Sequence, residues 1–460
     1  MSELMSGTTR TEPHYAGTTV NLGVDPVAAG VGLARGAEGP FVLYERHGEV
    51  SIGIGAAAEL IMTGREIRLT TQDGERRVPV GSEPLRQIGD LLAECGIAGW
   101  RAYGYFAFEL SYLLHGMPDA VGDATLAHLI VPAREVRLNG DSAELRALHT
   151  DDLAALCIEI EGLREVPATP VSELLADEMV GYDAYRNTVS AAVDDIHAQL
   201  LRKVILSRVV PVPGGADLAG TYQAGRRGNT PARSFLLNLG DLGAAGFSPE
   251  TVVEVRGDGT VSTQPLAGTR ALSGDTDTDT ALREELLADP KEIYEHAVSV
   301  LGAQEELRAV CTDGSVLVED FMSVSRRGSV QHLASRVTGR LAEDRTAWHA
   351  LACLFPAVTA SGVPKLEACQ AIHRYESEPR HLYSGAVVVA DADGSLDAAL
   401  VLRTVFQRAG RTWLRAGAGV VGQSNPEREF EETREKLRSI SRFLVPATEH
   451  VADDRRVVVP

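Results

Sequence analysis

Two pairs of glutamates stand three residues apart, each shortly after a proline that suits the first turn of a helix. The pairs are Glu292 with Glu295 and Glu429 with Glu432. Residues three apart share one side of a helix. If the two helices face each other, the carboxylates converge, and such a cluster is stable around a hard cation with oxygen ligands, for which Mg²⁺ is the leading choice. The same spacing also suits solvated acids that favour the helix dipole, so both interpretations stay open.

An amine and a carboxyl group are candidates for acid–base chemistry. Lys203 begins the β-branched segment 203–210, and a lysine buried on such a strand is pushed toward the neutral amine, which can act as a base. Glu250 follows the turn 246–249, and a carboxylic acid kept protonated in a cavity can act as a general acid. The alternatives are a lysine that extends to solvent and a glutamate that simply lies on the surface.

Hydrogen-bond donors for an anionic ligand lie in four other places. These are Leu266-Ala-Gly-Thr269, Tyr383-Ser-Gly385, Arg403 and Gly417-Ala-Gly419. Glycines let backbone N–H groups approach an anion, and an arginine can bind a carboxylate through two parallel hydrogen bonds. The glycine pair at 417 and 419 lacks the strand–GxGxxG–helix context of a dinucleotide site, and no P-loop motif is present.

The elements that must position these residues alternate irregularly between strands and helices. Helical spacing predicts helices over 182–201, from Pro290 onward, and from Pro426 to Leu444, where Asn425 suits the N-cap. Alternating apolar residues predict antiparallel strands over 41–80, and 382–421 is typical of a three-stranded meander. This order favours one large α+β domain over repeated βαβ units.

Composition narrows the class of protein. The chain has 460 residues, a net charge of −20 and five scattered cysteines without a C-x-x-C pair. The acidic balance argues against nucleic acid and anionic membranes as partners. The cysteine pattern and the absence of an apolar leader favour a cytoplasmic protein. The first 20 residues are expected to be disordered, and 451–460 is expected to be a tail.

Read together, these segments resemble the chorismate-utilising enzyme family, and within it the salicylate synthases of mycobactin-type siderophore pathways. The resemblance is closest over 182–444. It is carried by Lys203-Val-Ile-Leu-Ser-Arg208, Phe247-Ser-Pro-Glu250, Pro265-Leu-Ala-Gly-Thr-Arg270, Lys291-Glu-Ile-Tyr-Glu-His296, Ser329-Val-Gln-His-Leu333, Phe355-Pro-Ala-Val-Thr-Ala-Ser-Gly-Val-Pro364, Tyr383-Ser-Gly-Ala386 and Pro426-Glu-Arg-Glu-Phe-Glu-Glu-Thr433.

The resemblance implies a role for each candidate residue. Lys203 would activate a water that attacks C2 of chorismate, and Glu250 would protonate the departing C4 hydroxyl to give isochorismate; loss of pyruvate would then give salicylate. Mg²⁺ would hold the ring carboxylate. Its ligands would come from Glu292, Glu295, Glu429 and Glu432, and the substrate would contact Gly268, Thr269, His332, Thr359, Tyr383, Arg403, Gly417, Ala418, Gly419 and Lys436.

The resemblance also implies a monomer with one α+β domain, an antiparallel β-sandwich core wrapped by helices over 21–450, with an N-terminal part 21–170 and a catalytic part 171–450. An isochorismate synthase, which stops after the first step, is the alternative, and a non-catalytic chorismate-binding protein is a further one. The lysine base at 203 disfavours anthranilate synthesis, and Ala267 disfavours the aminodeoxychorismate branch. Gln264 departs from the family pattern, since the nearest relatives look acidic there.

Overall fold

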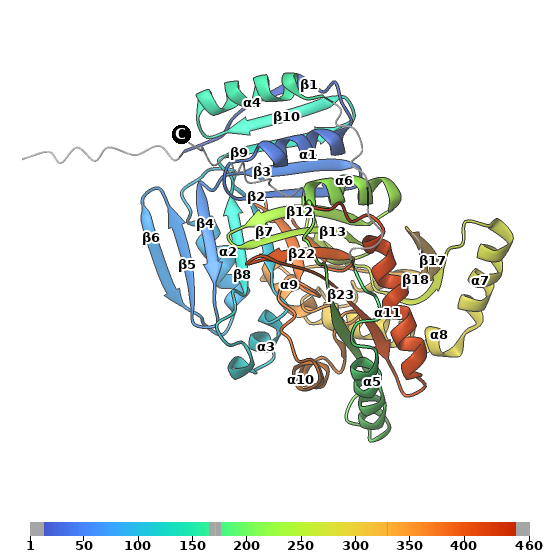
Figure 1. Ribbon diagram of the computed structural model, residues 1–460. Helices are drawn as coiled ribbons and strands as arrows, with labels where there is room; N and C mark the ends of the chain where they lie inside the picture. Colours follow the sequence, from blue (N-terminus) through green and yellow to red (C-terminus); the bar gives the residue numbers. More distant parts are fainter. Residues whose placement is uncertain (1–12, 165–170, 172–175, 329, 448–460) are drawn as a thin grey trace, which may run out of the picture.

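The structure is a computed structural model that describes residues 13–164, 171, 176–328 and 330–447 (Figure 1). The expected tail 451–460 lies outside these ranges. The helices are α1 (Pro26–Gly36), α2 (Pro84–Ala93), α3 (Leu110–Leu114), α4 (Thr150–Gly162), α5 (Tyr182–His197), α6 (Leu218–Gly228), α7 (Thr276–Ala288), α8 (Pro290–Arg308), α9 (Ala347–Leu354), α10 (Lys365–Tyr375) and α11 (Pro426–Ser441), with a 3₁₀ turn at Pro118–Ala120.

The strands form two large sheets, and the pairings between the strands named here are antiparallel. In order across it, the first sheet contains β1 (Ala16–Asn21), β10 (Ser142–Ala147), β9 (Arg134–Asn139), β3 (Glu49–Ile54), β2 (Phe41–Arg46), β12 (Arg233–Leu239), β13 (Leu242–Ser248), β22 (Thr404–Arg408), β23 (Arg411–Val420), β11 (Lys203–Pro211) and β19 (Gly362–Val363).

The second sheet contains, in order, β16 (Leu266–Ala271), β18 (Val330–Arg340), β15 (Thr260–Thr263), β14 (Thr251–Val255), β21 (Leu396–Leu400), β20 (Ala386–Asp391), β7 (Arg101–Phe106), β8 (Ala127–Val131), β4 (Ala58–Met62), β5 (Glu66–Thr71) and β6 (Gly74–Pro79). One further strand, β17 (Leu317–Arg327), pairs with β18.

The two sheets pack face to face around a buried apolar layer. Tyr44 and Phe235 reach this layer from the first sheet, and Tyr103 and Val387 reach it from the second. A second core lies under α1, α4, α6 and α11 on the outer face of the first sheet. A third combines the outer face of the second sheet with α2, α8, α9 and α10. The expected fold, an α+β domain with an antiparallel sandwich wrapped by helices, is confirmed.

Two helices bring the glutamate pairs to one end of the sandwich (Figure 1). The side chain of Asp289 caps α8 by accepting hydrogen bonds from the N–H groups of Lys291 and Glu292, and Asn425 caps α11 in the same way. Helix α11 lies beside β23, and β23 pairs with β11, the strand that begins at Lys203. The predicted N-cap and helix starts are therefore confirmed.

Two sequence-based expectations are wrong. Within the stretch 1–20 that we expected to be disordered, residues from Ala16 onward form β1, because their backbone groups pair with β10. The segment 382–421 contains four strands instead of three, two in each sheet. The chain crosses between the sheets at Arg403, whose φ of 51° interrupts the extended backbone.

Candidate active site

A largely buried cavity lies where both sheets meet α8 and α11. It offers about 70 Å³ for the centres of water molecules, which is room for several waters or part of one small ligand. Most of the residues expected at the site line it: Glu250, Gly268, Thr269, Glu295, His332, Thr359, Tyr383, Arg403, Gly417, Gly419, Glu432 and Lys436. Segments distant in sequence thus meet at one place.

Glu250 is held so that its carboxyl group is easily protonated. The side chain is 2% exposed, its Oε1 accepts a hydrogen bond from the Thr359 hydroxyl, and its Oε2 lies 2.7 Å from the Leu266 amide N–H. Burial raises the pKa of Glu250 to about 7, although these donors and the charges of Lys203 and Arg403 oppose the rise. A carboxyl group with such a pKa can deliver a proton near neutral pH.

Arg403 is a buried cation without a carboxylate partner among the described residues. Its Nη2 lies 2.6 Å from Nε2 of His332, and its Nη1 donates to the Arg327 carbonyl at 3.2 Å. Burial and the Arg327 charge lower the pKa of Arg403 to about 10, which leaves it protonated at neutral pH. An unpaired guanidinium on the wall of a cavity is suited to bind an anion.

His332 acts as a neutral hydrogen-bond relay beneath Arg403. Because Nε2 accepts from Arg403, the ring proton lies on Nδ1, which is 3.1 Å from the Thr269 hydroxyl and 3.3 Å from the Gly268 carbonyl. Burial, Arg403 and Lys436 hold the pKa of His332 well below its ordinary value. The imidazole therefore orients Arg403 without adding charge.

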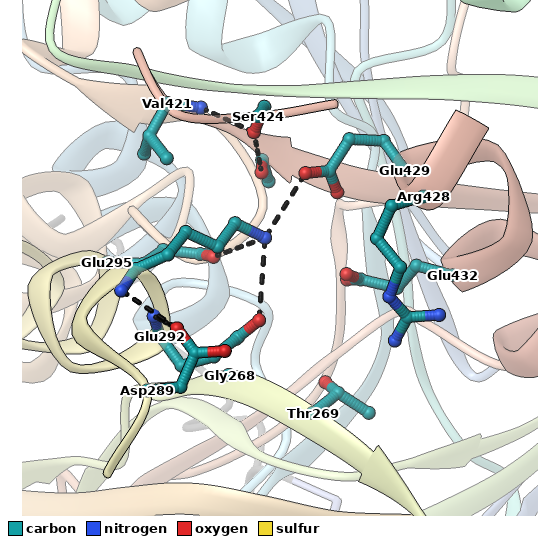
Figure 2. A network of polar contacts seen from close by, with 12 residues as sticks. Gly268, Thr269, Asp289, Glu292, Glu295, Val421, Ser424, Arg428, Glu429 and Glu432 are labelled. Atoms are coloured by element: carbon teal, nitrogen blue, oxygen red, sulfur yellow. Dashed lines mark hydrogen bonds and ion pairs between the residues drawn. The ribbon is translucent and has the colours of Figure 1, made fainter. Parts of the chain in front are cut away.

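Figure 2 shows Glu292 and Glu295 of α8 facing Glu429 and Glu432 of α11. Three of these four carboxylates contact one ammonium group, that of Lys291. Its Nζ lies 3.2 Å from Glu429 Oε1, 3.5 Å from Glu292 Oε1 and 3.9 Å from Glu295 Oε2. Glu432 adds a further carboxylate, which pairs with Lys436 at 2.7 Å. Burial opposes ionisation of Glu432, but Lys436 and Lys291 outweigh it and lower the pKa of Glu432.

Carboxylate oxygens are the ligands that a hard divalent cation prefers. Among the described residues, neither carboxylate oxygen of Glu429 has a hydrogen bond of good geometry, both oxygens are buried, and the side chain is 1% exposed. Burial and the charge of Glu432 raise the pKa of Glu429, as expected for a carboxylate that lacks compensation. Within 13–164, 171, 176–328 and 330–447, however, no three His, Cys, Asp or Glu side chains are grouped closely enough to hold an ion. Lys291 stands between the acids.

Lys203 does not line the cavity but lies directly behind it. Its side chain is 1% exposed, with Nζ 3.0 Å from Glu295 Oε1 and 2.9 Å from the Ser299 hydroxyl. Of the two possibilities left open for this lysine, the structure shows burial on β11. Glu295, which does line the cavity, separates the ammonium from the open space.

The glycines of β23 make room for side chains from neighbouring elements. A Cβ atom at position 419 would overlap the Glu295 carboxylate, and one at 417 would lie 3.1 Å from the Tyr383 hydroxyl. Ala418, which we expected to bind substrate, does not line the cavity, because alternate strand residues point to opposite faces. Its N–H lies 3.3 Å from the Tyr185 hydroxyl of α5 instead.

Glu292 and Glu429 also do not line the cavity, although both contact Lys291. Two charged residues at the site, Lys291 and Arg415, were not among the expected site residues. Lys291 precedes the first glutamate pair directly, so its position offered a signal. Arg415 lines the cavity and pairs with the buried Glu376 at 2.6 Å. It stands two residues before Gly417 on β23, and the two-residue strand period could have revealed it.

Comparisons with known proteins match this chain along most of its length. A model of the chorismate binding enzyme family matches residues 39–442. The salicylate synthase of Mycolicibacterium paratuberculosis is 39% identical over 97% of this chain and 99% of its own length. Anthranilate synthase component 1 of Mycolicibacterium smegmatis is 31% identical over 92% of this chain and 88% of its own.

Solved structures share the fold. Anthranilate synthase component I from Streptococcus pneumoniae superposes with a TM-score of 0.73 and 24% identity, covering 88% of this chain and 92% of its own. The menaquinone-specific isochorismate synthase of Escherichia coli gives a TM-score of 0.69 and 23% identity over 95% and 96%. No helix in the described part of the chain has the length and apolar character needed to cross a membrane. With the family match over most of the sequence, this chain belongs to the chorismate-binding enzyme family.

Proposed function

We propose that the protein is a Mg²⁺-dependent salicylate synthase that converts chorismate to isochorismate and then to salicylate and pyruvate. The observation that carries this proposal is that one cavity contains both Arg403, a buried cation without a carboxylate partner among the described residues, and Glu250, a protonatable acid. The similarity to a salicylate synthase over 97% of the chain supports the choice of product.

The cavity offers separate positions for the two carboxylates of chorismate. Arg403, Tyr383 and the β23 backbone at 417–419 would bind the enolpyruvyl carboxylate. Mg²⁺, when bound by Glu295, Glu429 and Glu432 with Glu292 beside them, would neutralise and orient the ring carboxylate. Lys436 would lie at that end, since its Nζ pairs with Glu432 at 2.7 Å. Binding of one carboxylate by Arg403 and of the other by Mg²⁺ would allow a strongly acidic protein to hold a dianion.

Glu250 would act as the general acid of the first step. With a pKa of about 7, the carboxyl group can give its proton to the departing C4 hydroxyl and take one back before the next turnover. Thr359 and the Leu266 N–H each donate to one carboxyl oxygen and so fix the orientation of the group that would carry the proton. Removal of this proton donor should slow the first step most.

Lys203 would take the proton from the water that attacks C2. In this structure its side chain contacts Glu295, which separates it from the cavity, so Lys203 would have to lose that contact before it meets the water. Glu295 is also one of the proposed cation ligands.

The second step would move a hydrogen from ring C2 to the enolpyruvyl methylene and release pyruvate. This rearrangement needs orientation more than acid or base catalysis. The fixed positions of Arg403 and Lys436 at the cavity wall would supply that orientation by holding both carboxylates of isochorismate. The salicylate would serve a siderophore or another salicylate-capped natural product.

Isochorismate synthase is the alternative, because the first step uses the same residues and structural neighbours with 22% and 23% identity include isochorismate synthases. The test is to incubate the purified protein with chorismate and Mg²⁺ and to follow salicylate by fluorescence and chorismate and isochorismate by chromatography. Salicylate formation supports the proposal, whereas isochorismate that accumulates without salicylate selects the alternative.

Two controls complete this test. Lys203→Ala should bind chorismate but form neither product; if wild type and variant both bind chorismate and leave it unchanged, the protein is a chorismate binder. A chelator such as EDTA should abolish turnover and added Mg²⁺ should restore it. Full activity in chelator would contradict the assignment of the glutamates to a cation.

A further inference from the structure

Lys291 has an unusual place among the acidic side chains at the cavity. It belongs to the first turn of α8, where the Asp289 side chain accepts a hydrogen bond from its backbone N–H at 2.9 Å. Its side chain reaches across to α11, and the ammonium lies within 4 Å of carboxylates from both helices. A single cation therefore bridges the two glutamate pairs.

Three of the four glutamates have another cationic partner. Arg270 lies 3.3 Å from Glu292, Lys203 lies 3.0 Å from Glu295, and Lys436 lies 2.7 Å from Glu432. These contacts compensate the three carboxylates independently of Lys291. Compensation of these three negative charges therefore does not require Lys291 in its observed position.

Glu429 is the exception. Among the ion pairs of the described residues, its only partner is Lys291, and neither of its oxygens has a hydrogen bond of good geometry, although the Ser424 hydroxyl favours the ionised form. A neighbouring arginine of α11, Arg428, is directed to Glu435 at 2.9 Å instead. A carboxylate that is 1% exposed needs compensation, and here one flexible side chain supplies it.

We propose that the positively charged Lys291 ammonium takes the place of the divalent cation and competes with it for Glu429, Glu295 and Glu292. This inference rests on the proposed function, because it assumes that these carboxylates hold Mg²⁺. Magnesium binds oxygen at about 2.0–2.1 Å, so ion and ammonium cannot share the same carboxylate oxygens. Lys291 must withdraw when Mg²⁺ enters.

The structure allows that withdrawal. The Lys291 side chain is 17% exposed, whereas that of Lys203 is 1% exposed, so only the former has a route to solvent from its present position. The Asp289 cap holds the backbone in place while the side chain moves. The substitute lowers the affinity for Mg²⁺ and keeps the carboxylates compensated while the ion is absent.

The first experiment measures Mg²⁺ binding to the substrate-free protein by isothermal titration calorimetry at one fixed pH. Lys291→Met removes the ammonium but keeps an unbranched side chain, and it should tighten Mg²⁺ binding about tenfold, as expected for removal of one competing ion pair. Arg308→Met, at the exposed far end of α8, is the matched control for the lost charge and should bind Mg²⁺ as wild type does.

The outcomes separate this inference from the proposed function. Equal or weaker Mg²⁺ binding by Lys291→Met, with binding retained by wild type, overturns the role of Lys291 only. If neither protein binds Mg²⁺, both the cation site and the inference fail. Binding by the variant alone supports the competition most strongly.

A second experiment uses the wild-type protein and so does not depend on the folding of a variant. An amine-acetylating reagent is applied with and without Mg²⁺, and each lysine is quantified by mass spectrometry. Acetylation of Lys291 should rise several-fold with Mg²⁺, while Lys365, paired at 2.7 Å with the distant Glu306, should not change. Unchanged labelling of Lys291 at saturating Mg²⁺ overturns the proposal.

Discussion

Replacement of Glu250 by glutamine should remove the general acid and also change how stability depends on pH. The variant keeps the shape of the side chain, and its amide can still accept from the Leu266 N–H and donate to Thr359. The kcat for chorismate should fall about 10²–10⁴-fold, the usual contribution of a positioned acid. The pH dependence of the free energy of unfolding tests the pKa of the same carboxyl group independently.

The size of the expected change in stability follows from the pKa of Glu250. Burial raises the pKa of Glu250 from 4.5 to about 7, so between these values the folded protein binds the proton more tightly than the unfolded chain does. Stability conferred at low pH is therefore lost as the pH rises through this window. At about 1.4 kcal/mol for each pKa unit, the loss amounts to about 3 kcal/mol, of which about 2 kcal/mol develops between pH 5.5 and 8.

The assay is urea unfolding of both proteins at these two pH values, in chelator and without substrate. Other titrating groups are common to both proteins and cancel in the difference between them. Relative to wild type, Glu250→Gln should gain about 2 kcal/mol between pH 5.5 and 8. A stability difference that does not vary with pH would refute the raised pKa and, with it, the assignment of Glu250 as a proton donor at neutral pH.

Three further substitutions test other parts of the site and its support. Arg403→Lys keeps a charge but loses the planar fork, so KM for chorismate should rise about 10–100-fold in steady-state assays; an unchanged KM would contradict carboxylate binding there. Asp397→Asn leaves Arg233, which is 3% exposed and 2.6 Å away, without its nearest carboxylate, and should cost about 3–5 kcal/mol in denaturant unfolding; a cost below about 1 kcal/mol would argue against this pair as a support. Gly419→Ala places a methyl group against Glu295 and should weaken Mg²⁺ binding in calorimetry while the circular dichroism spectrum stays unchanged; wild-type affinity would show that Glu295 has room to move.

Local patterns predicted the elements that carry the site. Proline at the first helical position and Asn425 at the N-cap act within a few residues, so the start of α11 could be found from sequence. The β-branched run after Lys203 likewise predicted β11. The spacing of the glutamate pairs placed each pair on one side of its helix.

How the helices and strands pack against one another was harder to predict from the sequence. Periodicity does not show that a lysine from α8 separates glutamates of two helices, because this depends on how α8 and α11 pack. The extra strand in 382–421 was missed because Arg403 adopts a left-handed backbone conformation that residue type does not indicate. Such strain is common where the surrounding structure holds a functional side chain in place.

The cavity has walls from both sheets and from α11, whose last turns lie close to the end of the described chain. A nascent or partly unfolded molecule that lacks α11 would have no Glu432 or Lys436 at the cavity and would present an incomplete site. A ligand that needs every wall binds the native state alone and stabilises it by mass action. Chorismate supply could therefore govern how long the enzyme survives proteolysis in the cell as well as how fast it works.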